Sequence, residues 1–124
     1  MAKKASRKTL IKKLDTITSK IIRERTPYCV QCGSTENLTC GHVFSRRHYS
    51  TRWDIRENGN LQTQCWGCNY KHGLDNFDYY EWFKLAYGEK QFLKLREEYT
   101  TTKKFSNVEL EEMIKEYKRI LDAI

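Results

Sequence analysis

The stretch CWGCNYKHG, from Cys65 to Gly73, places four side chains of metal-binding types within eight residues. The spacing Cys65-x2-Cys68 is that of one half of a zinc site. Asn69 and His72 follow, and residues three apart on a helix share one face. Gly73 is typical of a residue that ends a helix. We therefore predict a short helix that zinc holds at its start, and whose next turn offers an oxygen and a nitrogen to a second divalent ion. Singly, Asn69 would be an ordinary surface residue and His72 a cation near a helix C-terminus.

A second cysteine pair with the same spacing, Cys29-x2-Cys32, lies 32 residues before the first. Four thiolates make a closed tetrahedral Zn²⁺ site without an open coordination position, so we predict a structural zinc. The alternative is that the four cysteines occur by chance and bind no metal. Cys40, the fifth, is expected to be a small buried residue on a strand. No apolar signal segment follows the start and no run approaches transmembrane length, which favours an intracellular protein with reduced thiols.

The sequence pattern predicts an α+β fold with a zinc-held core at residues 26–74. Within this core we expect a hairpin with strands at 38–44 and 61–65, a long polar loop at 45–60, and a helix at 66–72. An amphipathic helix at 9–25 precedes it, within a basic N-terminal arm at residues 1–25. A helical extension at 75–124 follows, with helices at 77–87, 89–99 and 107–123, and Ser106 and Glu109 form a capping box before the last.

Basic residues are concentrated at the N-terminus. Residues 1–25 hold nine Lys or Arg against two acidic residues, which accounts for the whole net charge of +7. Such an arm suits phosphate binding through counterion release, although basic arms also act as solubility tails. The apolar stripe of the 9–25 helix is most simply a packing face; a membrane-surface helix is disfavoured because the stripe has no Trp or Phe. The apolar side of the last helix predicts packing within the chain, with a dimer seam as the alternative.

Beyond these patterns, the sequence resembles the zinc-bearing HNH, or ββα-metal, nucleases, and more narrowly the phage NinG or Rap recombination proteins. The resemblance runs from about Ile21 to the C-terminus. It is carried by the segments IRERTPYCVQCG, CGHVFSRR, TRWDIREN, QCWGCNYKHG and YEWFKLAYGEK. The segment CNYKHG is also similar to part of recombination endonuclease VII, where an acid stands three residues after the Asn. The resemblance implies a ββα-metal core and a structure-specific DNA endonuclease that hydrolyses Holliday junctions and other branched recombination intermediates in the bacterial cytoplasm.

The resemblance also implies roles for individual residues. His42 would be the general base that takes a proton from water, and Asn60 would hold the loop against the strand. Asn69 and His72 would bind the catalytic Mg²⁺ or Mn²⁺. The sequence departs from the family at Gly41 and Thr39, where relatives carry a first metal ligand. Asp54 is the nearest acidic residue in the loop that could replace it.

Cations and aromatic residues alternate in the 45–60 loop, a composition that suits phosphate binding and stacking on exposed bases. The predicted DNA contacts are Arg46, Arg47, Arg52 and Trp53. No base-reading motif is visible, so recognition of DNA shape is expected. A resolvase that cuts two opposed strands implies a homodimer. The alternatives are a less specific HNH nicking nuclease, a zinc-dependent DNA-binding module without catalysis, and a zinc-built protein-interaction domain.

Overall fold

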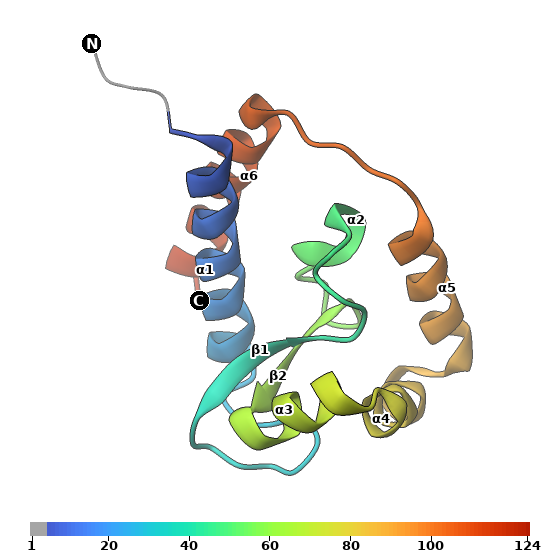
Figure 1. Cartoon of the computed structure of the whole chain (residues 1–124). Helices are drawn as coiled ribbons and strands as arrows, with labels where there is room; N and C mark the ends of the chain where they lie inside the picture. The colour runs from blue at the N-terminus through green and yellow to red at the C-terminus, as the bar shows by residue number, and fades with distance from the viewer. Residues whose placement is uncertain (1–4) are drawn as a thin grey trace.

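The computed structural model describes residues 5–124, so the first four residues of the predicted basic arm lie outside it. Over the described residues the fold is α+β, with six helices around one two-stranded antiparallel hairpin (Figure 1). The elements are α1 Arg7–Arg25, β1 Leu38–His42, α2 Tyr49–Arg52, β2 Leu61–Cys65, α3 Trp66–Leu74, α4 Phe77–Tyr87, α5 Glu89–Thr100 and α6 Asn107–Asp122.

The hairpin and α3 follow the predicted order, with two differences at element ends. The strands pair from Leu38 opposite Cys65 to His42 opposite Leu61. β1 ends two residues before the predicted bound, because the backbone of Phe44 bonds to the Asn60 side chain instead of to β2. This side chain accepts from the Phe44 N–H and donates to the Phe44 C=O. The prediction that Gly73 ends α3 is wrong: the helix continues to Leu74, and Gly73 is not one of the described glycines with positive φ.

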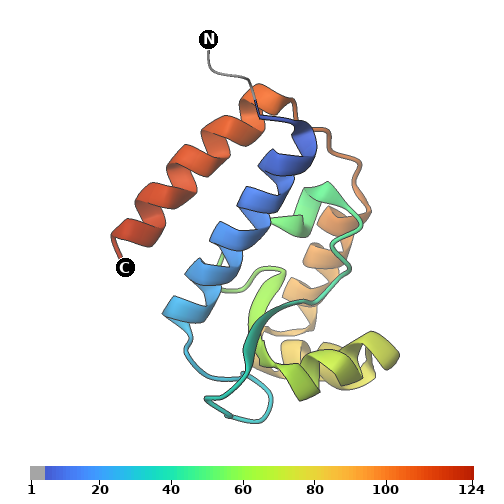
Figure 2. The ribbon, with the colours of Figure 1, turned by 60° about the vertical axis from the view of Figure 1, so that its left-hand side comes forward.

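Helix α1 uses its apolar stripe to pack against α6, which lies beside it and runs in the same direction (Figure 2). Ser6 caps α1 by accepting from the Thr9 N–H, and the predicted capping box of Ser106 and Glu109 starts α6. Their shared core buries Leu10, Leu14, Ile17, Ile21, Trp53, Leu110 and Ile114. The expectation that α6 packs within its own chain is therefore confirmed.

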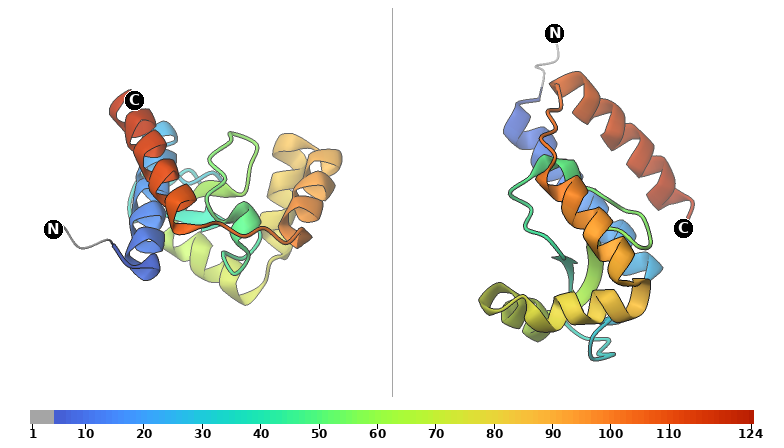
Figure 3. Two further views of the ribbon diagram at one scale, coloured as in Figure 1. Left: turned by 90° about the horizontal axis from the view of Figure 1, so that it is seen from above. Right: turned by 90° about the vertical axis from the view of Figure 1, so that its right-hand side faces the viewer.

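Helices α4 and α5 cover the opposite side of the 45–60 loop, so that the loop lies between two helical pairs (Figure 3). Val43 and Phe44, the residues that follow β1, enter the core of this second pair. Its other buried members are Tyr79, Phe83, Phe92 and Leu95. The single-turn helix α2 in the loop was not predicted, because four residues are too few for a periodic pattern.

None of the helices in residues 5–124 combines the length and the apolarity that crossing a membrane requires.

Candidate functional site

The four cysteines of the two Cys-x2-Cys pairs come together at the end of the hairpin where β2 meets α3. Their sulfur atoms all lie within 4.8 Å of one another, and the Sγ atoms of Cys32 and Cys65 are 3.6 Å apart. Four thiolates at the usual Zn–S distance of about 2.3 Å stand about 3.8 Å apart in a tetrahedron. All five cysteines are free. The cluster of Cys29, Cys32, Cys65 and Cys68 therefore fits Zn²⁺, which would hold the two segments together and supply no chemistry of its own.

Local backbone structure shapes both halves of the four-cysteine cluster. In the first half, Gly33 donates its N–H to the Cys29 carbonyl at 2.8 Å and adopts a φ of +79°, a conformation that glycine allows at little cost. In the second half, Cys65 caps α3, and its sulfur accepts from the Cys68 N–H at 3.4 Å. The N–H of Val30 donates to the Thr63 carbonyl, which attaches the first half to β2. The cluster is thus part of the hairpin.

The local electrostatics of the cluster favour a thiolate at Cys29. Burial by itself raises the pKa of this thiol, but hydrogen bonds from the backbone of Cys65, Cys32 and Gln31 outweigh it and lower the pKa to about 7. The pKa of Cys68 is raised, first by burial and then by its three neighbouring thiols. A divalent cation would stabilise all four thiolates, because metal binding displaces their protons.

The predicted catalytic residues meet at a second place. His42, Asn69 and His72 all line one cavity of about 670 Å³, beside Arg46 and Cys40. His42 comes from the end of β1, and the other two from the face of α3 that looks toward this strand. The sequence-based expectation that the hairpin strand lies beside Asn69 and His72 is therefore correct.

His42 is held in one tautomer by the loop. Its Nε2 lies 3.2 Å from the carbonyl oxygen of Arg52. A carbonyl only accepts, so Nε2 carries the hydrogen and Nδ1 keeps a lone pair in the neutral ring. Burial lowers the pKa of His42 to about 4, against a weaker opposing effect of the Arg52 carbonyl. The imidazole is therefore neutral at physiological pH, with one nitrogen able to accept a proton.

Asn69 is oriented by Thr39, one of the two residues at which the sequence departs from the HNH nucleases that it resembles. Its Nδ2 donates to the Thr39 hydroxyl at 3.0 Å, and that hydroxyl donates to the Gln64 carbonyl at 2.8 Å. The amide oxygen of Asn69 is thereby left to face another partner. Gly41 is the second residue at which the sequence departs from those nucleases. A Cβ at this position would lie 1.8 Å from Oε1 of Gln64. The Gln64 side chain thus occupies the space that a larger residue at 41 would need.

His72 is a less available ligand than the sequence suggests. Its Nε2 donates to the backbone carbonyl of His42 at 2.8 Å. Its Nδ1 is buried and has no hydrogen-bond partner among residues 5–124. The ring packs edge-on against Tyr79 with centroids 4.5 Å apart, and burial lowers its pKa. His72 therefore ties α3 to β1 as a neutral side chain.

These donors fit a catalytic Mg²⁺ poorly. Mg²⁺ prefers oxygen ligands and is usually held by one or two carboxylates. The 670 Å³ cavity has no Asp or Glu among its described lining residues, and its amide oxygens come from Asn69 and Asn76. Asp54 does not fill the gap, because its carboxylate accepts from the backbone of Arg56 and Asn60 and pairs with the Arg56 side chain.

Asn60 does hold the loop against the strand. It is fully buried. Its Oδ1 accepts from the Phe44 N–H at 2.8 Å, and its Nδ2 donates to the carbonyls of Phe44 and Thr51 at 2.9 and 3.2 Å. All its side-chain atoms are thus committed to the backbone, and a catalytic contribution would come through positioning His42.

The four predicted DNA contacts divide into two kinds. Arg46 and Arg47 are exposed, as a phosphate contact requires. Trp53 is 3% exposed and belongs to the core between α1 and α6, so the expectation that it stacks on exposed bases needs correction. Arg52 forms a two-pronged ion pair with Asp15, with contacts of 3.0 and 2.7 Å; its contact with DNA remains a prediction.

Asp15 is the residue that sequence reasoning missed. Burial alone would raise its pKa, but hydrogen bonds from Arg52 and Trp53 lower the pKa below its ordinary value. Since the Arg52 carbonyl accepts from His42, Asp15 indirectly supports the position of His42. The available signal was an acidic residue next to Leu14, a member of the apolar stripe, in a helix that is mostly basic.

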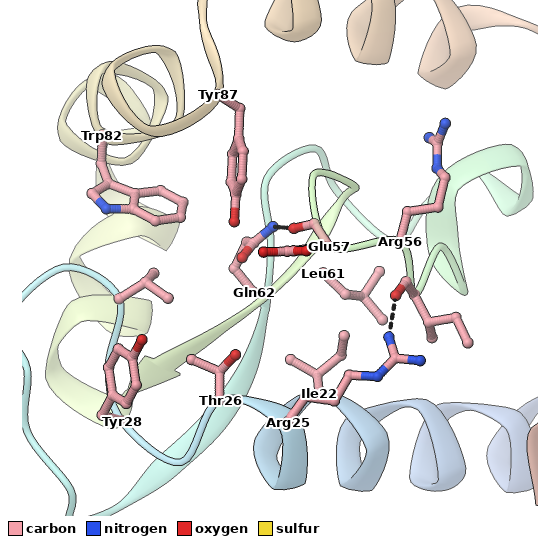
Figure 4. Close-up of a pocket in the computed structure, with 12 residues that line it drawn as sticks. Ile22, Arg25, Thr26, Tyr28, Arg56, Glu57, Leu61, Gln62, Trp82 and Tyr87 are labelled. Atoms are coloured by element: carbon pink, nitrogen blue, oxygen red, sulfur yellow. Dashed lines mark hydrogen bonds between the residues drawn. The ribbon is translucent and has the colours of Figure 1, made fainter. Parts of the chain in front are cut away.

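A further cavity of about 590 Å³ lies between the end of α1, β2 and α4 (Figure 4). Tyr28, Trp82 and Tyr87 form aromatic walls, and Arg25 and Glu57 lie nearby. None of the predicted site residues lines this cavity, so it stands apart from the His42 site.

Neither a family model, nor a curated protein, nor a solved structure matches this chain.

Proposed function

We propose that the chain is a zinc-containing DNA endonuclease of the HNH, or ββα-metal, type that cuts branched DNA such as Holliday junctions. The observation that carries the proposal is the hydrogen bond from Nε2 of His42 to the Arg52 carbonyl, in a cavity that Asn69 also lines. A neutral imidazole with one free nitrogen suits a general base that activates water for attack on a phosphodiester.

The surroundings of His42 support an anionic substrate. Arg46 lines the same cavity, and Arg47 is exposed beside it. Guanidinium groups bind phosphate oxygens in a bidentate fashion. The sequence carries no recognisable base-reading motif, which favours a substrate recognised by its shape. In this proposal Arg46 binds the phosphate next to the scissile bond, and His42 takes a proton from the attacking water.

A second candidate function follows from the missing carboxylate. Gly41 and Thr39 provide no acidic ligand, and Asn69 and His72 alone fit Mg²⁺ poorly. The alternative is therefore a zinc-dependent DNA-binding module that does not cut. A homodimer belongs to the first candidate, since two opposed strands must be cut, and sedimentation of the protein bound to a junction would measure it.

The deciding experiment is cleavage of a labelled four-way junction beside a linear duplex of the same sequence. Mg²⁺ or Mn²⁺ is added to metal-depleted buffer instead of being removed by a chelator, because a chelator would also extract the zinc. His42→Ala is compared with His48→Ala, which removes a histidine that lines none of the cavities described above. Junction cutting that is lost only in His42→Ala supports the nuclease. Junction binding without cutting by the unmodified chain supports the second candidate, and equal cutting of both DNAs indicates a less specific nicking enzyme.

A further inference from the structure

Three cavities adjoin one another along β1. The first, of about 430 Å³, is lined by Asn37, Leu38, Thr39 and Trp66. The second, of about 280 Å³, shares Leu38 and Thr39 with it. The third is the 670 Å³ cavity of His42, which shares Cys40, His42 and Arg46 with the second. Because neighbouring cavities share lining residues from Leu38 to His42, we treat the three as one surface along the strand, the β1 furrow.

Helix α1 forms one wall of the β1 furrow and contributes an arginine. Arg23 lines the second cavity, and its Nε donates to the carbonyl and hydroxyl oxygens of Ser19 at 3.2 and 3.1 Å. The terminal nitrogens of Arg23 are thereby left for another acceptor. Arg46 lines both the second and the third cavity. Within residues 5–124, neither arginine takes part in an ion pair.

The charge of the β1 furrow is positive over its described residues. Asp15 is the one carboxylate among its lining residues, and Arg52 already neutralises it with a contact of 2.7 Å. Two arginines without ion pairs, both lining a cavity with His42, are therefore complementary to an anionic chain whose charges repeat along its length. A row of phosphates has this property, whereas a peptide strand pairing with β1 would need no such charges.

The end of the β1 furrow near the four-cysteine cluster carries an exposed aromatic stack. Trp66 and Tyr70 are 63% and 56% exposed, yet their rings already stack on each other at 5.3 Å with an interplanar angle of 13°. Large aromatic residues are normally more buried than this. A stacked, exposed pair beside a positive groove is suited to receive the face of an unpaired base.

We infer that the β1 furrow binds a single strand of nucleic acid, with Arg23 and Arg46 on successive phosphates and Trp66 stacked on a base. This inference rests on the proposed function, which it deepens by naming the bound element as an unpaired strand leaving a branch point. It also gives α1 a role in substrate binding, as a wall of the groove.

Binding of a fluorescently labelled single-stranded oligonucleotide tests the inference. The affinity of the chain is measured over a range of salt concentrations for Arg23→Gln and for Arg119→Gln, an exposed arginine of α6 that lines no part of the furrow. Each lost phosphate contact lowers the slope of log affinity against log salt by about 0.7 on single strands. Arg23→Gln is expected to lose about this much, and Arg119→Gln to retain the full slope.

Tryptophan fluorescence provides the second readout. Strand binding is expected to quench the exposed Trp66, and Trp66→Phe to bind with little quenching. If the unmodified chain binds a strand but Arg23→Gln keeps the slope of Arg119→Gln, the furrow is not the path of the strand, and the proposed function still stands. If the chain cuts or binds branched DNA and ignores single strands, the inference also fails alone. If no nucleic acid binds, both fail, and binding of an extended peptide would then identify the furrow as a strand-pairing site.

Discussion

The two ends of the hairpin are held together by different kinds of interaction. At the end where Leu38 pairs with Cys65, four thiols surround a site for Zn²⁺. At the end where His42 pairs with Leu61, the side chains of Asn60 and Asp54 close the hairpin by accepting hydrogen bonds from the backbone N–H groups of Phe44 and Asn60. The first closure would combine metal–thiolate bonds with the backbone hydrogen bond from Val30 to Thr63, and the second is made by side chains that the chain always carries. The contacts that orient His42 therefore include no cysteine of the cluster, whereas a bound Zn²⁺ would add to the hydrogen bonds that hold α3 beside β1.

The largest expected effect comes from breaking the four-cysteine end. Cys65→Ser removes a ligand and the cap of α3 together. Because structural zinc contributes about 10–16 kcal/mol to the folding of small zinc domains, we expect loss of stoichiometric zinc and of cooperative unfolding. Circular dichroism and metal analysis measure this. Cys40→Ser is the matched control and should keep its zinc; a Cys65→Ser variant that melts like the unmodified chain would contradict a structural zinc.

The Asn60 end should break without any loss of metal. Asn60→Ala leaves the buried N–H and C=O of Phe44 without partners, and we expect a loss of about 3–5 kcal/mol of unfolding free energy. Urea unfolding measures it, and zinc content should remain stoichiometric. Asn58→Ala, at an exposed asparagine of the same loop, should change stability by less than about 0.5 kcal/mol. Parallel loss of zinc and stability in Asn60→Ala would show that the two ends are not independent.

Between the two ends, Gly41 tests the packing of the strand. Gly41→Ala places a Cβ against Gln64, and such overpacking costs about 1–3 kcal/mol. Adding Gln64→Ala should recover part of this loss. Gly67→Ala in α3 meets no atom within 4 Å and should be neutral or stabilising by up to about 1 kcal/mol. Additive losses in the double variant would rule out the clash as the cause.

The smallest expected effect concerns the support of the loop by α1. The folded pKa of Asp15 lies below its unfolded value of 3.8. Its contribution to stability is therefore complete above that unfolded pKa and is lost as pH falls through the lower folded pKa. Asp15→Asn should cost about 1 kcal/mol at pH 6, and the difference from the unmodified chain should shrink below about pH 4. Unfolding curves at several pH values measure this. A difference that stays constant down to pH 2 would exclude the ionised pair.

Local signals predicted most elements, and long-range contacts account for what was missed. Periodicity and caps gave the helices, and cysteine spacing brought His42 beside Asn69. The burial of Trp53 was not predictable, because it depends on α1 and α6, which lie far from it in the chain. The pairing of Asp15 with Arg52 spans 37 positions, and no short-range pattern reports such a contact. The side chain of Gln64 fills the space beside Gly41, and this contact likewise depends on the pairing of the two strands.

The parallel packing of α1 and α6 has a consequence for synthesis on the ribosome. Arg7 contacts Phe105 and Asn107, at separations of 98 and 100 positions. The apolar stripe of the first helix therefore emerges long before the helix that covers it. At about 5–20 residues per second, the roughly 80 residues between the two helices take about 4–16 s to translate. During that interval the nascent chain exposes an apolar helix face flanked by lysines. Holding chaperones bind exposed apolar surface of this kind.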